Sequence, residues 1–182
     1  MKKVLLINGS PNKNGNTAAA LSVAERVLSE KGIAAERIEL GKKPVRGCIA
    51  CERCDDTKRC VFDDDVCNTI IEKILECDAV IIGTPVYFAG PNGALCAVLD
   101  RVFYAASCKG QLFAGKPGAA LATVWREGGT AALDRINKYF TYAEMPVISS
   151  NYWNVVLDSG SDDYGNAVIE RMAENMAALL LK

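Results

Sequence analysis

The chain has 182 residues, 50% of them apolar, and a formal net charge of −1. This length and composition are enough for one compact hydrophobic core, and the mixed charges give no reason to expect a nucleic acid or an anionic membrane as partner. The chain contains no histidine, which excludes Ser-His-Asp and Cys-His catalysis, histidine metal ligands and a histidine general base. Any chemistry must therefore come from carboxylates, thiols, lysine, tyrosine or a cofactor.

No run of the sequence approaches the roughly 18 apolar residues of a membrane span. The chain begins Met-Lys-Lys and continues directly into an apolar strand pattern, which is not the core of a signal peptide. We therefore expect a cytoplasmic protein with no membrane partner. Disulfide bonds are not expected in that compartment, although the chain has eight cysteines.

The first predicted element is a strand that ends in a loop suited to a phosphate. Residues 4–7 are wholly apolar with β-branched members, which is typical of a central parallel strand. Residues 10–17 are small and polar, and a helical pattern follows at once, so free N–H groups at the helix start point into the loop and favour an anion. Asn16 follows Gly15 where a Walker loop requires lysine, so the loop suits a phosphate monoester better than a triphosphate. The alternative is a capped turn that binds nothing.

The rest of the chain alternates strands and helices. Further strands are expected at 36–40, 79–83, 118–124 and 146–149. Helices with apolar residues on one face are expected directly after the phosphate loop and at 64–77, 92–104, 130–142 and 163–181. Five strands alternating with five helices predict a single α/β domain over 1–182, with a parallel sheet and helices on both faces. The connections 41–63 and 105–116 are long enough to be functional.

Two further loops follow strands of this sheet, at the edge where ligands bind in such folds. The loop 84–93 holds Tyr87 and Phe88 between prolines and glycines, which predicts a stiff wall against a flat ligand. The loop 123–129 adds Trp125 and a charge at the same edge. The alternative for these aromatic residues is ordinary packing in the core or in an interface.

These motifs together resemble the NADPH-dependent FMN reductases of the flavodoxin-like superfamily and, more narrowly, the iron–sulfur flavoproteins. The motifs that carry the resemblance are the loop 10–17, the loop 84–88 and the Gly128-Gly129 turn. The resemblance covers most of the chain. It implies a flavodoxin-like three-layer sandwich whose five-stranded parallel sheet has the order 2-1-3-4-5, and it implies bound FMN.

The resemblance also implies which residues contact the flavin. The implied phosphate ligands are Ser10, Asn12, Asn14, Gly15, Asn16 and Thr17. The implied contacts of the isoalloxazine ring are Pro85, Val86, Tyr87, Phe88, Ala89, Thr123, Trp125, Arg126, Glu127, Gly128 and Gly129. Residues 125–127 depart from the family pattern ahead of the glycine pair, which leaves the details of the ring contact open.

Four of the cysteines form the compact spacing C-x2-C-x2-C-x5-C, at Cys48, Cys51, Cys54 and Cys60. Four thiolates this close together can hold one compact cluster, and the spacing resembles the cluster motif of the iron–sulfur flavoproteins, which implies a [4Fe–4S] cluster in the loop insertion 41–63. Zinc is an alternative, although its sites usually separate two ligand pairs by a longer spacer. Free or redox-active thiols are the other alternative.

The sequence around this motif assigns the remaining cysteines less clearly. Cys67, Cys77 and Cys96 lie in helical or strand-edge apolar patterns and are expected to be buried as small hydrophobic residues, whereas Cys108 is ambiguous. Four basic residues near the motif could offset the negative charge of a cluster: Arg46, Arg53, Lys58 and Arg59.

The preferred function is an oxidoreductase in which NAD(P)H passes a hydride to FMN, which passes electrons to an acceptor. The acceptor is expected to be a flavin, a quinone, an iron–sulfur cluster or a redox protein, and the choice between NADH and NADPH stays open. No catalytic side chain is required, because the flavin carries the chemistry. The alternatives are a non-catalytic electron carrier and a flavin- or metal-binding regulatory module. Carriers of the flavodoxin kind are more acidic than this chain, which argues against the first of them by analogy.

The aromatic residues predict self-association. More of them fall in or beside loops than one sheet edge needs: Tyr87, Phe88, Phe103, Tyr104, Phe113 and Trp125. Exposed aromatic patches usually mark interfaces, and relatives of the resembled kind form dimers or tetramers. We therefore expect a homodimer or a homotetramer.

Overall fold

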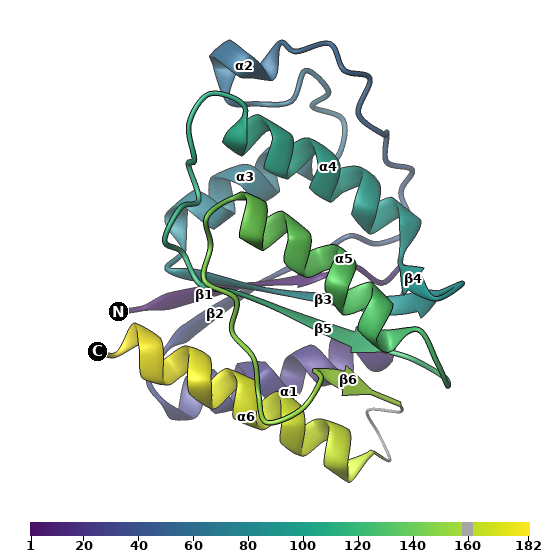
Figure 1. The fold of residues 1–182 in the computed structure, drawn as a ribbon, viewed down its shortest axis with the longest axis vertical. Helices are drawn as coiled ribbons and strands as arrows, with labels where there is room; N and C mark the ends of the chain where they lie inside the picture. The colour runs from purple at the N-terminus through teal and green to yellow at the C-terminus, as the bar shows by residue number, and fades with distance from the viewer. Residues whose placement is uncertain (158–161) are drawn as a thin grey trace.

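A parallel β-sheet separates two layers of helices in the computed structural model, which describes residues 1–157 and 162–182 (Figure 1). The strand order is β2-β1-β3-β5-β6, with all neighbours on that path parallel, and a short β4 pairs antiparallel with the end of β3. The strands are β1 Lys3–Asn8, β2 Ala34–Glu39, β3 Ala79–Tyr87, β4 Gly90–Pro91, β5 Gly118–Thr123 and β6 Val155–Val156.

Helices cover both faces of this sheet. The helices are α1 Asn16–Glu30, α2 Cys54–Thr57, α3 Cys67–Glu76, α4 Gly93–Ser107, α5 Gly129–Tyr142 and α6 Asp163–Leu180. Figure 1 shows α3, α4 and α5 on one face and α1 and α6 on the other, with the one-turn helix α2 on the outer side of α4. In the described parts of the chain, every helix is too short or too polar to cross a membrane.

The sequence of β1 explains why both faces are covered. Its residues Val4, Leu5, Leu6 and Ile7 are each 0% exposed. Leu5 and Ile7 pack with α3, α4 and α5, whereas Val4 and Leu6 pack with α1 and α6, because successive side chains of a strand point to opposite faces. The predicted three-layer sandwich is confirmed, and the observed strand order is the predicted 2-1-3-4-5 once the short β4 is left out of the count.

The position of the last strand differs from the prediction. The predicted strand over 146–149 is wrong, since that segment makes a single bridge to β5 and the strand itself forms at Val155–Val156. The side chain of Asn154 explains the displacement: its Nδ2 donates to the Ala120 carbonyl at 3.0 Å, in place of a main-chain N–H from a continued strand. The ladder resumes where the Ala122 N–H donates to the Asn154 carbonyl at 2.9 Å.

Two aromatic residues that the sequence places near loops belong to the core. Phe103 and Phe113 are 3% and 0% exposed, and their rings meet edge to face at 5.6 Å. Phe103 also contacts Tyr139 and Phe140, with ring centroids 5.2 and 6.0 Å away. These rings fill the space between α4, α5 and the long connection after α4, so the prediction that Phe103 and Phe113 belong to an interface is wrong.

This packing gives a stability prediction at Gly118. A Cβ atom there would lie 2.7 Å from the Phe140 ring, which is fully buried. We expect Gly118→Ala to lower the free energy of unfolding by about 1–3 kcal/mol, as overpacking in a core does. The control is Gly93→Ala at the start of α4, where a Cβ would meet nothing within 4 Å and the protein should be as stable or more stable. Urea unfolding measures both, and equal stability of Gly118→Ala and the unsubstituted protein would contradict the packing.

Candidate functional site

The loops after β1, β3 and β5 enclose an open cleft of about 330 Å³. It brings together ten of the residues predicted to contact a flavin, together with Val124 of the predicted loop 123–129 and Leu157, which the sequence did not suggest. The ten are Ser10, Asn12, Gly15, Asn16, Thr17, Pro85, Val86, Tyr87, Thr123 and Trp125. The cleft lies at the carboxyl edge of the parallel sheet, where ligands bind in folds of this class.

The first loop is shaped by its own hydrogen bonds. Asn8 Oδ1 accepts from the Ser10 N–H at 3.1 Å, and Ser10 Oγ accepts from the Asn12 N–H at 3.1 Å. The Gly15 N–H donates to the Asn12 carbonyl at 3.2 Å. Helix α1 then begins at Asn16, and no side chain of the described residues caps it. The first N–H groups of α1 are therefore available to an anion in the cleft, and the alternative of a capped turn is not what forms here.

Two buried hydroxyl groups join the first and third loops. The Oγ1 atoms of Thr17 and Thr123 lie 2.7 Å apart, and these residues are 2% and 6% exposed. One hydroxyl donates to the other, so the accepting hydroxyl keeps a proton for a further partner. The pair fixes the start of α1 against the end of β5 and presents one donor next to the cleft.

Lysines lie beside the first loop. Lys13 and Lys42 line a shallow hollow together with residues 11, 12, 14 and 15. Asn14 therefore lines this hollow and not the cleft. Lys42 follows β2, so the sequence alone gives no sign that it lies close to the loop after β1. Its position follows from the parallel pairing of β1 with β2, which brings their carboxyl ends together.

The second loop is a strained hairpin between β3 and β4. Tyr87 pairs with Gly90, so Phe88 and Ala89 form a two-residue turn, and both have positive φ, at 50° and 59°. Such turns normally use Asn-Gly, because side chains disfavour this backbone. Phe88 is completely exposed at the tip, and Tyr87 is 46% exposed. Strain of this kind concentrates at functional sites.

The third loop touches this hairpin through Gly128. Its φ is +87°, and a Cβ atom there would lie 2.9 Å from the Ala89 Cβ and 3.1 Å from Val86. Glycine is thus required both for the backbone conformation and for the close approach. Residues 126–129 turn away from the cleft and line a second hollow of about 420 Å³, which shares Val124, Leu157 and the third loop with it. The structure therefore divides nine of the predicted ring contacts between the two hollows, whereas Phe88 and Ala89 line neither of them.

The four motif cysteines line one small cavity of about 20 Å³. Cys48 and Cys51 are exposed, and Cys54 and Cys60 are half-buried. Three non-glycine residues around them have left-handed backbones, with φ of 51° to 57°, and these turn the loop back on itself: Ala50, Glu52 and Lys58. The loop geometry is therefore specific, and it gathers the four side chains that the spacing predicted.

The distances between the motif sulfurs argue against a single zinc ion. A tetrahedral zinc site with Zn–S bonds of about 2.3 Å holds its sulfurs about 3.8 Å apart. Within the described residues, no three of the motif sulfurs lie within 4.8 Å of one another. The motif sulfurs are therefore not arranged as a ready-made zinc tetrahedron in the described residues.

Two of the motif sulfurs already accept hydrogen bonds. Cys48 Sγ accepts from the Ala50 N–H at 3.4 Å, and Cys60 Sγ accepts from Arg101 Nε at 3.1 Å. The side chain of Asn68, which is 3% exposed, holds the main chain of Cys60: Asn68 Oδ1 accepts from the Cys60 N–H, and Asn68 Nδ2 donates to the Cys60 carbonyl. Hydrogen bonds to sulfur stabilise thiolate ligands and tune cluster potentials.

Arg101 is the buried cation of this cavity. It is 2% exposed and forms a bidentate ion pair with Asp65. It also donates to the carbonyls of Arg46 and Phe62, each at 3.2 Å, so both ends of the cysteine loop are tied to α4. Burial acts against its charge, but the bonds to Asp65 and Cys60 outweigh it and raise the pKa of Arg101 above its usual range.

Sequence reasoning missed Arg101 and selected the loop cations instead. The available signal was its position inside the helical pattern 92–104, next to Val102 on the apolar face. An arginine there must find partners, because an unpaired buried charge is costly. Of the cysteines outside the motif, Cys67 and Cys77 are buried as predicted, and burial raises the pKa of the Cys67 thiol to about 12. Cys96 is only half-buried.

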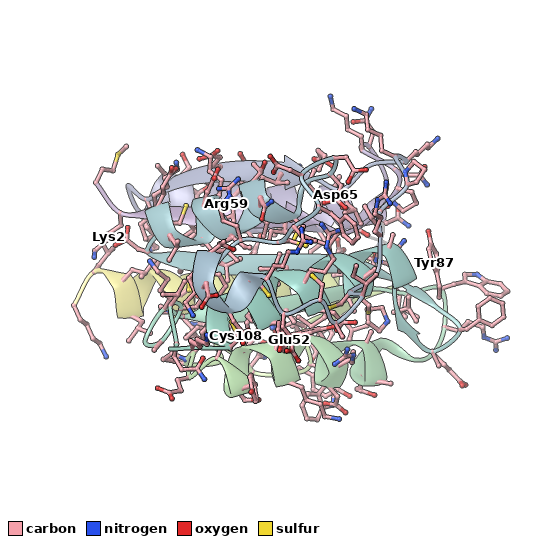
Figure 2. All side chains as sticks on the ribbon, turned by 90° about the horizontal axis from the view of Figure 1, so that it is seen from above. Lys2, Glu52, Arg59, Asp65, Tyr87 and Cys108 are labelled. Carbon is pink, nitrogen blue, oxygen red and sulfur yellow. The ribbon has the colours of Figure 1, made fainter. Side chains whose placement is uncertain are left out.

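The cysteine cavity and the cleft are separate features of the chain. No described residue lines both of them. Figure 2 shows Tyr87 at one end of the molecule, whereas Glu52 and Cys108 lie near its middle. Among the described residues, the cysteine loop therefore does not line the cleft of its own chain.

Comparison with known proteins identifies the family of the chain. Residues 2–159 match the family described as NADPH-dependent FMN reductase. An iron–sulfur flavoprotein of Methanocaldococcus jannaschii is 34% identical over 151 residues, which are 82% of this chain and 77% of that protein. A second iron–sulfur flavoprotein of that organism is 31% identical over 182 residues, or 97% of this chain and 91% of its own length.

A solved structure supports the fold. A flavodoxin from the domain Archaea has a TM-score of 0.67 and 14% identity, over 99% of both chains. At that identity the likeness shows the flavodoxin-like fold and nothing more. The family match, by contrast, extends over nearly the whole sequence, and with the two relatives it shows that this chain belongs to the NADPH-dependent FMN reductase family.

Proposed function

We propose that the cleft between the three loops binds FMN and that the protein passes electrons from NAD(P)H through FMN to an acceptor. Membership of the family makes the chain an FMN-dependent oxidoreductase. The position of the FMN site and the path of the electrons are what we propose here. The observation that carries it is the uncapped start of α1 beside the cleft. FMN supplies hydride and electron transfer when it is bound.

The chain's own residues bind and orient the phosphate end. The first N–H groups of α1 and the side chains of Ser10, Asn12, Asn16 and Thr17 offer donors to a monoester phosphate, with Asn14 and Gly15 completing the loop. Lys13 and Lys42 add positive charge at the mouth of this loop. Because the loop carries one helix start and few cations, it suits the single phosphate of FMN better than the pyrophosphate of FAD.

The other two loops hold the flat part of the ligand. Pro85, Val86 and Tyr87 offer one wall of the cleft, and Thr123 and Trp125 offer the other. Phe88, Ala89 and the segment 126–129 act as the frame, since Gly128 fixes the distance between the two walls. No side chain is assigned a proton-transfer step, which agrees with the absence of histidine.

The phosphate site is tested by Ser10→Ala combined with Thr17→Ala. Each lost charge-assisted hydrogen bond is worth about 1.5–3 kcal/mol with imperfect additivity. We expect a total loss of about 2–4 kcal/mol, which is a roughly 30- to 700-fold weaker Kd for FMN. Ser22→Ala is the control, because this hydroxyl lies in the same helix and donates to the Ala18 carbonyl at 3.0 Å. Fluorescence titration with FMN measures all three proteins, and an unchanged Kd in the double variant would contradict the site.

The electron route is tested on the same proteins. FMN-loaded protein should oxidise NADH or NADPH in the presence of free flavin or a quinone, and the double variant should need more added FMN for the same rate. A protein that binds FMN but turns over neither nucleotide would instead be the electron carrier considered above.

We also propose that Cys48, Cys51, Cys54 and Cys60 hold a [4Fe–4S] cluster. The support is the shared cavity and the hydrogen bonds to Cys48 and Cys60. The two curated relatives described above are named iron–sulfur flavoproteins. Arg101 would stabilise the negative charge of the ligands through Cys60.

The cluster prediction is tested by anaerobic reconstitution with iron and sulfide. We expect about four irons per chain in the unsubstituted protein, as four cysteines hold a [4Fe–4S] cluster, and fewer in Cys51→Ser. Cys96→Ser removes a half-buried cysteine outside the motif and should bind as much iron as the unsubstituted protein. Equal, near-zero iron in all three proteins would contradict the cluster, and stoichiometric zinc without iron would favour the zinc alternative.

The separation of cavity and cleft favours an assembly in which subunits complete one another. We propose a homodimer or a homotetramer in which the cysteine loop of one subunit approaches the cleft of another. The exposed aromatic residues at the sheet edge support it, since Phe88, Trp125 and Tyr87 are 107%, 88% and 46% exposed. Such aromatic patches are typical of interfaces.

The assembly is tested by Phe88→Asn. Asparagine tolerates the left-handed backbone of this turn, so the substitution removes the ring and keeps the hairpin. We expect the unsubstituted protein to have the mass of a dimer or tetramer at micromolar concentration, and Phe88→Asn to have a lower one. Tyr142→Ser is the control, since Tyr142 is 69% exposed at the end of α5 and should not change the mass. Light scattering measures these masses, and a monomeric unsubstituted protein would refute the assembly.

A further inference from the structure

A fifth cysteine lies against the cysteine motif. Cys108 follows α4 directly, and its Sγ is 3.6 Å from the carbonyl oxygen of Cys54. The sulfurs of Cys54 and Cys108 and a carboxylate oxygen of Asp55 all lie within 4.8 Å of one another. Both cysteines are half-buried, and Cys108 lies on the face that Figure 2 presents to the viewer. Cys54 is thus a motif ligand with a second thiol at hand.

Polar contacts hold this pair together. Lys58, at the end of α2, donates to the carbonyl of Lys109 at 2.9 Å and lies 3.9 Å from the Cys108 sulfur. The Lys109 ammonium in turn pairs with Asp56 at 2.9 Å. These contacts tie α2 to the end of α4 from both sides of the cysteine pair. The two sulfurs are therefore neighbours because of the fold, although they are 54 positions apart in the sequence.

We propose that Cys54 and Cys108 form a reversible disulfide when the cysteine cavity holds no cluster, and that this disulfide and the cluster exclude each other. The disulfide rests on the geometry of the pair alone. The exclusion rests on the proposed cluster, because a sulfur bonded to Cys108 cannot ligate iron. Oxidation would thus block cluster binding by removing one of four ligands.

The reaction uses a small disulfide such as oxidised glutathione as the oxidant. The Cys108 sulfur attacks one sulfur of this disulfide, which forms a mixed disulfide and releases one small thiol that takes the Cys108 proton. The Cys54 sulfur then attacks the Cys108 sulfur, releasing the second small thiol with the Cys54 proton. Two protein thiols are oxidised and one small disulfide is reduced to two thiols, so atoms and electrons balance.

The pair requires little movement to react. A disulfide bond is about 2.0 Å long, so the sulfurs must approach by rotation of their side chains and a small shift of α2. Helix α2 is a single turn without fully buried residues, which makes such a shift inexpensive. Cys60 and Cys67 are also neighbours, since burial and, to a smaller extent, the charge of Cys60 raise the pKa of the Cys67 thiol. Cys67, however, is 0% exposed and out of reach of a dissolved oxidant.

Trypsin makes the disulfide directly observable. Cleavage after lysine and arginine places Cys54 in the peptide 54–58 and Cys108 in the peptide 102–109, each with one cysteine. Protein prepared without iron is treated with oxidised glutathione, its free thiols are alkylated, and it is digested without reductant. We expect mass spectrometry to find these two peptides cross-linked, and to find them separate after reduction. The link should be absent in Cys108→Ser and present in Cys96→Ser.

Iron uptake then tests the exclusion. Oxidised protein should take up less iron on anaerobic reconstitution than reduced protein, and prior reduction should restore it, whereas Cys108→Ser should bind equal iron after either treatment. A glutathione adduct, a Cys60–Cys67 link or no link at all would overturn the proposal. So would a Cys54–Cys108 link in protein whose iron uptake is unaffected. A cross-link in protein that never binds iron, even when reduced, would instead refute the cluster while the disulfide stands.

Discussion

The sheet must bury both of its faces, and this requirement decides where polar chemistry can lie. With β1 fully enclosed between two layers of helices, polar groups that act on a ligand are confined to the ends of the strands. The parallel order then brings the ends of β1, β3 and β5 to one edge. The cleft is a consequence of that geometry, and the Thr17–Thr123 contact is the point at which the sheet and the first helix lock together.

The cysteine loop depends on a different interaction. Only a few of its side chains pack against the core, among them Val45, Cys54 and Cys60, so much of its shape must come from polar contacts. Arg101 supplies them by reaching from α4 to Asp65, to Cys60 and to carbonyls on both sides of the motif. A buried arginine with this many partners is costly to unpair, which gives a loop without a core of its own a single conformation. The proposed cluster and the folding of the loop would therefore depend on the same arginine.

Much of this architecture could be predicted from the sequence, because apolar periodicity reports burial. The runs at 4–7 and 79–83 and the helical patterns identify the layers, and the cysteine spacing identifies a shared cavity. What could not be predicted depends on single side chains acting over long distances. Asn154 moved the last strand by bonding to Ala120, and the four-residue helix α2 is too short to show a period. Phe113 is buried in the core, although the segment around it has no helical or strand periodicity that would predict burial.

The contact between Gly128 and Ala89 has a mechanical consequence. The third loop and the β3–β4 hairpin meet without space for a single methyl group, and the hairpin already holds two non-glycine residues at positive φ. Neither can be displaced without moving the other. The fully exposed Phe88 is thus connected through these contacts to both walls of the cleft. A partner that contacts the Phe88 ring would therefore change the positions of the cleft walls. Association and ligand binding would then be energetically coupled through two adjacent loops, with no rearrangement of the sheet.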